Sequence, residues 1–166
     1  IVVTSEPGIG TAFSIYLPAL SLGVTAVDPA PLADVPRGQG QSILLVEDEA
    51  SLRASLVELL TGLGYQVEEA PNGAEAFVRL TDPARMAAAP VALILSDVVM
   101  PRMGGVALLK VLRQRGIQTP LVLMSGHPMS DDRAGLEQQG MTAWLDKPPS
   151  RWQLAHTVAA ALQGLE

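Results

Sequence analysis

The sequence contains no cysteine. This absence excludes disulfide bonds, thiolate nucleophiles and zinc sites built from thiolate ligands. Structural disulfides belong to oxidising compartments, so a chain without cysteine is compatible with a reducing one. We therefore expect a cytoplasmic location.

Positive charge is also scarce. Lysine and arginine together number 11, against 17 aspartate and glutamate residues, and the formal net charge is -6. Binding to phosphate backbones or anionic lipid surfaces relies on clustered basic residues. The charge balance therefore predicts no nucleic-acid partner.

Long apolar runs are missing as well. The longest ones, such as Val91 to Leu95 and Leu121 to Met124, fall far short of the roughly 20 apolar residues that a membrane-spanning helix needs. The sequence therefore predicts no direct contact with a membrane.

What remains is a chain of 166 residues, 48% of them hydrophobic, which suffices for one well-packed domain and a small appendage. Residues 1–18 predict two short strands, Ile1 to Thr4 and Ala12 to Leu17, around the glycine-rich turn from Glu6 to Gly10. Because the chain begins inside a strand, we expect it to be part of a longer protein. Residues 19–41 are rich in proline and glycine and predict a linker.

Residues 42–166 alternate short β-type runs with segments whose apolar residues recur every three to four positions. This alternation is typical of βα units on a parallel sheet, and it predicts an open, doubly wound α/β fold. The predicted strands are Ile43 to Val46, Gln66 to Glu69, Ala92 to Ser96, Leu121 to Met124 and Ala143 to Leu145.

Five helices are predicted between and after these strands. Each has a boundary signal in the sequence, either a glycine at its end or a capping residue at its start. In chain order these signals are Gly64 ending the first helix, Asn72 and Gly73 before the second, Gly116 ending the third, Ser130 and Gly140 bounding the fourth, and Ser150 capping the last.

Polar residues follow four of the predicted strands. Glu47 and Asp48 come after the first, Asp97 after the third, Ser125 after the fourth, and Lys147 shortly after the fifth. In such sheets the ligand site lies at the carboxyl ends of the strands, so we expect these side chains to converge.

Clustered carboxylates stay ionised together only when a cation neutralises them. Mg²⁺ is the natural candidate, because it prefers oxygen ligands and is usually held by one or two carboxylates plus phosphate oxygens. With charge neutralised in this way, one carboxylate can attack phosphorus and form an acyl phosphate.

The same residues carry a family resemblance. ILLVEDEA at 43–50, LILSDVVMPRMGG at 93–105, LMSGH at 123–127 and WLDKPP at 144–149 resemble the motifs of the response-regulator receiver domain, in the same order and at similar spacing. The resemblance spans Ser42 to Glu166. It implies a flavodoxin-like, CheY-like (βα)5 sheet with the strand order 2-1-3-4-5.

For the metal site, the resemblance implies that Asp97 is the phosphorylated aspartate and that Asp48 binds Mg²⁺ directly. Glu47 would act largely through metal-bound water, and the backbone carbonyl of Val99 would be a further ligand. The acidic pair here is Glu-Asp, where Asp-Asp is commoner in the family, and we expect this difference to move one water without abolishing the site.

For the phosphoryl group, the resemblance implies that Lys147 pairs with it, that Ser125 closes over it, and that Pro148 follows a cis peptide bond. The position three residues before the lysine is the family's switch aromatic, which is Trp144 here and more often Tyr or Phe. Two readings of Trp144 stay open: a ring that swings inward, or a ring simply half buried beside the last helix.

The N-terminal residues carry a second resemblance. SEPGIGTAFSIYLP, residues 5–18, is similar to the end of a histidine-kinase ATPase domain. It implies a hybrid sensor kinase as the parent protein, whose upstream part could be anchored in a membrane. The implied partners are the kinase's dimerisation and phosphotransfer domain or a histidine phosphotransfer protein, with a receiver homodimer as a further possibility.

Two alternatives to a phosphoacceptor remain. One is a degenerate receiver that serves only as an interaction or dimerisation module and shows no Mg²⁺ dependence. The other is a phosphatase with an aspartyl nucleophile, similar to the haloacid dehalogenase group. Those enzymes need a second acid two residues after the nucleophile, a position that Val99 occupies here.

Overall fold

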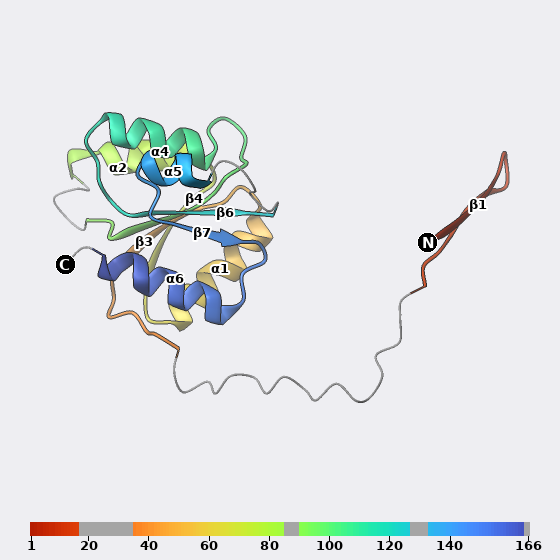
Figure 1. Cartoon of the computed structure of the whole chain (residues 1–166), viewed down its shortest axis with the longest axis horizontal. Coiled ribbons are helices and arrows are strands. Elements are labelled where there is room, and N and C mark those ends of the chain that lie inside the picture. The colour runs from red at the N-terminus through yellow and green to blue at the C-terminus, as the bar shows by residue number, and fades with distance from the viewer. Residues whose placement is uncertain (17–34, 85–89, 127–132, 165–166) are drawn as a thin grey trace. The chain divides into compact units, whose positions relative to one another are not determined.

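The computed structural model describes residues 1–16, 35–84, 90–126 and 133–164 (Figure 1). The chain divides into two compact units, Ile1–Asp34 and Val35–Glu166. In the described part of the chain, no helix combines the length and the apolar composition needed to cross a membrane.

The first unit contains an antiparallel hairpin of β1 (Val2–Glu6) and β2 (Gly10–Ser14). The predicted strand ranges were wrong at the turn, because Glu6 and Gly10 pair with each other rather than lying within the loop. The turn is tighter than predicted: the N–H of Ile9 donates to the carbonyl oxygen of Glu6 at 3.1 Å. The prediction was also wrong at the other end of the second strand, because β2 ends at Ser14 and the described residues 15 and 16 are not in a strand; the predicted last residue, Leu17, lies outside the described residues.

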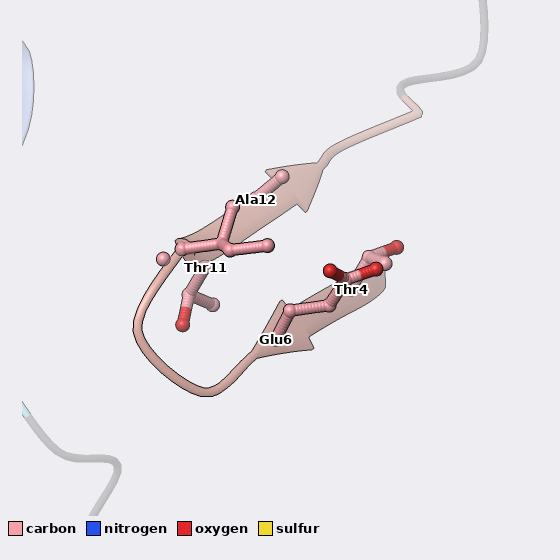
Figure 2. Close-up of a pocket in the computed structure, with 6 residues that line it drawn as sticks. Thr4, Glu6, Thr11 and Ala12 are labelled. Carbon is pink, nitrogen blue, oxygen red and sulfur yellow. The ribbon is translucent and has the colours of Figure 1, made fainter.

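The hairpin buries none of its described side chains. A shallow hollow on it is lined by residues that include Thr4, Glu6, Thr11 and Ala12 (Figure 2). Every lining side chain is exposed to solvent, so this hollow offers no enclosed polar group to a ligand. The candidate site must be sought in the second unit.

The second unit is built on a five-stranded parallel sheet in the order β4-β3-β5-β6-β7. Counted from the first strand of this unit, that order is 2-1-3-4-5, which confirms the predicted flavodoxin-like topology. The strands are β3 (Ser42–Val46), β4 (Gln66–Ala70), β5 (Leu93–Asp97), β6 (Leu121–Ser125) and β7 (Ala143–Asp146).

Helices cover both faces of this sheet (Figure 1). Successive side chains of a strand point to opposite faces, so Ile43 and Leu45 join one apolar core while Leu44 and Val46 join the other. Both faces are therefore buried. On one face lie α1 (Ala50–Gly62) and α6 (Arg151–Gln163), and on the other α2 (Gly73–Thr81), α4 (Gly105–Gln114) and α5 (Arg133–Gln138).

Two of the predicted helix caps are present. Oδ1 of Asn72 accepts a hydrogen bond from the N–H of Glu75 at 3.0 Å at the start of α2. Ser150 and Gln153 form a reciprocal capping box at the start of α6. The predicted cap Ser130 lies outside the described residues, which resume at Arg133 in α5.

The last residues of the predicted linker pack on the second unit. The N–H of Gly38 donates to the carbonyl of Leu63, and that of Gly40 to the carbonyl of Gly64, both at 2.9 Å. Val35 packs against the core beneath α1 and α6. These contacts explain why the compact unit begins at Val35, before the predicted boundary at Ser42.

Candidate phosphoryl-transfer site

The predicted site residues lie where the parallel strands end. Glu47 directly follows β3, and its N–H still donates to the carbonyl of Ala70 in the neighbouring strand at 3.1 Å. Asp97 is the last residue of β5 and Ser125 the last of β6. Lys147 follows β7, and its N–H donates to the carbonyl of Ser125 at 2.7 Å. Four strands therefore deliver these residues to one edge of the sheet.

Three carboxylates form a cluster at this edge. One oxygen each of Glu47, Asp48 and Asp97 lies within 4.8 Å of the others. Glu47 is 1% exposed and Asp97 9%, whereas Asp48 is open to solvent. Like charges this close repel one another, and the repulsion is weakly screened where the groups are buried. The cluster therefore favours a neutralising cation.

Lys147 supplies part of that positive charge. Its Nζ donates to Oε2 of Glu47 at 2.5 Å and lies 2.9 Å from Oδ2 of Asp97. Counting side-chain atoms alone, Lys147 is 14% exposed, Glu47 1% and Asp97 12%. Charge-assisted hydrogen bonds of this length are among the stronger ones in proteins. One ammonium group thus bridges two of the three carboxylates.

The bridge and the burial shift the pKa values of both partners. Burial raises the pKa of Glu47 because it disfavours the charged carboxylate, and repulsion from Asp97 adds to this rise while Lys147 opposes it. Burial by itself would lower the pKa of Lys147, but hydrogen bonds with Glu47 and Asp97 outweigh it and raise that pKa. Lys147 is therefore charged at neutral pH.

The donor set fits Mg²⁺. Lys147 bonds one oxygen of Glu47 and one of Asp97. Within the described residues, long hydrogen bonds reach the other oxygens: the N–H of Glu49 lies 3.3 Å from Oε1 of Glu47, and the N–H of Val99 lies 3.4 Å from Oδ1 of Asp97. Asp48 adds an exposed carboxylate. These are the hard oxygen ligands that Mg²⁺ prefers, with solvent access for the waters it keeps.

The structure also describes the surroundings of the remaining predicted residues. The Val99 side chain is 74% exposed, and its carbonyl remains a predicted ligand. Ser125 is 6% exposed. The Trp144 ring is half-buried against the core under α2, α4 and α5, and its Nε1 donates to Oδ1 of Asp146 at 3.0 Å. The Lys147–Pro148 peptide bond is cis.

Two glycines after Asp97 were quoted in a motif but given no role by the sequence reasoning. A Cβ built on Gly105 would lie 2.3 Å from the carbonyl oxygen of Asp97 and 2.6 Å from Cδ2 of Leu123. A Cβ on Gly104 would lie 2.3 Å from the carbonyl oxygen of Val98. The start of α4 therefore packs directly against the backbone of Asp97, and only glycine leaves room for it.

We expect Gly105→Ala to destabilise the domain by about 2 kcal/mol, because the new methyl group overpacks a filled space beside Asp97. Urea unfolding followed by circular dichroism measures the effect. Gly62→Ala in α1 is the matched control, since its added Cβ meets nothing within 4 Å. The control should leave stability equal or slightly higher. Equal stability of the two variants would contradict the packing argument.

The sequence reasoning also missed Arg53 of α1. Its guanidinium donates to the backbone carbonyls of Glu47 and Asp48, the acidic pair of the cluster. By its periodicity, Arg53 occupies an ordinary surface position of a helix. No signal in the sequence therefore distinguished it from other surface arginines.

Comparisons with known proteins identify the family of the second unit. The family model described as "Response regulator receiver domain" matches residues 43–159. The chain is 34% identical over 167 aligned positions to Sensor kinase CckA of Brucella abortus (strain 2308), covering 96% of this chain and 17% of that protein. It is 30% identical over 145 positions to Sensor protein EvgS of Escherichia coli (strain K12), covering 87% of this chain and 12% of that one.

Among solved structures, a signal receiver domain of a signal transduction histidine kinase from Syntrophus aciditrophicus superimposes with a TM-score of 0.62 at 32% identity. That match covers 76% of this chain and 93% of the other. This chain spans only about a sixth or less of the two sensor proteins it matches. With the family model matching well over half of the residues, the chain belongs to the response regulator receiver domain family.

Proposed function

We propose that this chain is the phosphoacceptor of a histidine-to-aspartate phosphorelay, with Asp97 as the residue that is phosphorylated. The observation that carries the proposal is the position of Asp97, which shares one ammonium group, Lys147, with Glu47 and lies in a carboxylate cluster suited to Mg²⁺. A nucleophilic carboxylate thus has a buried cation and candidate metal ligands beside it.

In the proposed reaction an Asp97 carboxylate oxygen attacks the phosphorus atom of a phosphohistidine. A P–O bond forms, the P–N bond breaks, and the imidazole leaves as the neutral ring after taking up a proton. Lys147 moves its ammonium group from the carboxylates toward the arriving phosphoryl oxygens, and Ser125 donates a hydrogen bond to one of them. Charge compensation by these donors lowers the barrier.

Glu47, Asp48, Asp97 and the carbonyl of Val99 are the proposed holders of Mg²⁺. When bound, the ion neutralises the negative charge that the phosphoryl group brings to an already acidic site. Glu47 and Asp48 contribute carboxylate oxygens to the proposed site. Because Glu47 is buried, its carboxylate is kept out of bulk water. Trp144 is proposed to report phosphorylation to the neighbouring surface by moving its half-buried ring.

We propose a hybrid sensor kinase as the parent protein, with residues 1–18 as the end of its ATPase domain, 19–41 as the linker, whose last residues from Val35 pack on the second unit, and 42–166 as the receiver. Similarity to the sensor kinase CckA extends over 96% of the chain and so reaches beyond the receiver. The proposed partners are the kinase's own phosphotransfer domain or a histidine phosphotransfer protein, with receiver homodimers as a further possibility. The proposed location of the chain is the cytoplasm.

The test is uptake of a phosphoryl group from acetyl phosphate, measured by intact mass. We expect a gain of about 80 Da, one phosphoryl group, with Mg²⁺ and none when the metal is chelated. A phosphohistidine donor should give the same product faster. No gain from either donor would replace the proposal by a degenerate receiver that acts as an interaction module.

A further inference from the structure

Arg53 connects the acidic pair to the neighbouring strand. It lies in the first turn of α1, where its N–H donates to the carbonyl of Glu49 at 2.9 Å. Its Nη1 donates to the backbone carbonyl of Glu47 at 2.7 Å and to that of Asp48 at 3.3 Å. Its Nε donates to Oε2 of Glu69 in β4 at 3.1 Å. A single guanidinium therefore binds both acidic residues and an anchor on the sheet.

Among the described residues, the backbone of the loop from Glu47 to Glu49 makes few other hydrogen bonds, although its side chains are held by Lys147 at Glu47 and by Ser51 at Glu49. Sheet pairing of β3 with β4 ends where the N–H of Glu47 donates to Ala70. Glu49, the N-cap of α1, makes no side-chain cap hydrogen bond. The Glu49 N–H makes only a 3.3 Å bond to Oε1 of Glu47. In the described part of the chain, the 2.7 Å bond from Arg53 is thus the shortest hydrogen bond to the backbone of this loop.

The guanidinium is itself held in place. The Arg53 side chain is 19% exposed, and its Nε meets Glu69 from the sheet side while Nη1 meets the carbonyls of the loop. The planar fork of arginine fixes the directions of its donors, which the single ammonium of lysine cannot do. Restraint from both sides allows Arg53 to transmit the position of β4 to the acidic loop.

We propose that Arg53 is a positioning residue for the metal ligands: it holds the Glu47 and Asp48 carbonyls so that the two carboxylates are in place before Mg²⁺ binds. The inference rests on the proposed function for its metal, and it adds a residue to the site. Outer partners that orient metal ligands typically contribute 10-fold to 100-fold in metal affinity.

The sign of the effect separates this role from simple electrostatics. A guanidinium close to a cation site repels the cation, so removing its charge would tighten Mg²⁺ binding if charge alone mattered. Loss of positioning weakens Mg²⁺ binding instead, because part of the binding free energy is then used to order the two carboxylates. A weaker site in the absence of Arg53 therefore indicates positioning.

The experiment compares Arg53→Met, Arg53→Lys and, as a matched control, Arg133→Met. Arg133 makes a similar ion pair, 3.0 Å from its Nε to Glu137, on an exposed helix surface. Two readouts are used: the Mg²⁺ dissociation constant from calorimetry, and the exchange rate of the Glu49 amide hydrogen from nuclear magnetic resonance of the metal-free protein. Neither depends on phosphoryl transfer.

For Arg53→Met we expect a dissociation constant raised about 10-fold and faster exchange of the Glu49 amide. Arg53→Lys keeps the charge, and we expect its dissociation constant and its Glu49 exchange rate to lie between those of Arg53→Met and the unaltered protein. If Arg53→Met does not fold, Arg53→Lys is measured in its place. Arg133→Met should leave both readouts within about twofold, since it only removes an exposed surface ion pair.

Unchanged or tighter binding in Arg53→Met would overturn the positioning role, as would full restoration by Arg53→Lys, which would show that the donor geometry of the guanidinium is not required. An equal change in Arg133→Met would also overturn it. If the unaltered protein binds no Mg²⁺, the proposed function fails instead, and the Glu49 exchange rates still decide whether Arg53 orders the loop.

Discussion

An Asp97→Asn variant is expected to take up no phosphoryl group under conditions that fully modify the unaltered chain. The amide is nearly the same size as the carboxylate and can still accept a hydrogen bond from Lys147, which lies 2.9 Å from Oδ2 of Asp97. It lacks the charged oxygen needed to attack phosphorus. The fold should persist while the chemistry disappears.

Intact mass after incubation with acetyl phosphate and Mg²⁺ measures this effect. Asp146→Asn is the matched control, because Asp146 is an exposed aspartate outside the carboxylate cluster that accepts a hydrogen bond from Trp144. The control should gain about 80 Da like the unaltered chain, the mass of one phosphoryl group attached to the nucleophile. A Mg²⁺-dependent gain that survives in Asp97→Asn would move the acceptor to another residue.

A Lys147→Met variant is expected to lose about 3 kcal/mol of stability in the absence of metal. The ammonium forms ion pairs with the carboxylates of Glu47 and Asp97, whose side chains are 1% and 12% exposed. Removing one partner of a buried ion pair leaves uncompensated charge and lowers the free energy of unfolding by roughly 3–5 kcal/mol. In thermal unfolding this corresponds to a fall in Tm on the order of 10 °C.

Mg²⁺ should restore much of that loss. The ion neutralises the same carboxylates and binds only the folded chain, so its stabilising effect should be larger in Lys147→Met than in the unaltered protein. Lys110→Met, which changes the chain's only other lysine at an exposed position of α4, is the matched control and should leave Tm within a degree or two, as is usual for surface substitutions. A Tm unaffected by Lys147→Met would show that the carboxylates are compensated in another way.

Phosphoryl uptake by Lys147→Met should also fall steeply. The ammonium is the proposed counter-charge for the transferred group, and preorganised charge of this kind is worth about 100-fold or more in rate at comparable sites. Uptake measured at saturating Mg²⁺, where the fold is restored, separates this catalytic loss from the loss of stability.

Much of the fold was predictable from local pattern. The strands of the second unit read as short apolar runs, and the helices between them carried glycine or capping signals such as Asn72 and Ser150, which the structure confirms. The first and last residues of the strands were predicted less accurately, with errors of about one residue. The reason is that hydrogen bonding between strands continues as far as the neighbouring strand extends. Asp97, for instance, is the last residue of β5 through its pairing with Met124.

The hairpin and the linker show where local pattern fails. Glycine and proline signals placed the turn from Glu6 to Gly10, but antiparallel register brought those two residues into the ladder. Composition likewise assigned residues 35–41 to a linker. Hydrogen bonds from Gly38 and Gly40 to the turn after α1 placed them on the domain, and nothing in their own composition indicated that docking partner.

By itself the sequence determined the kinds of residue available: polar groups directly after apolar strands, no cysteine, and fewer basic than acidic residues. These properties depend on composition and on the period-2 and period-3.6 patterns, which are local. Only the tertiary structure decided that Lys147 bridges Glu47 and Asp97, that Gly105 packs against the Asp97 backbone, and that Arg53 holds the acidic loop. Each of these contacts joins segments that meet only because parallel strands end at one edge of the sheet or because a helix packs back onto it, and the distances involved are set by that packing.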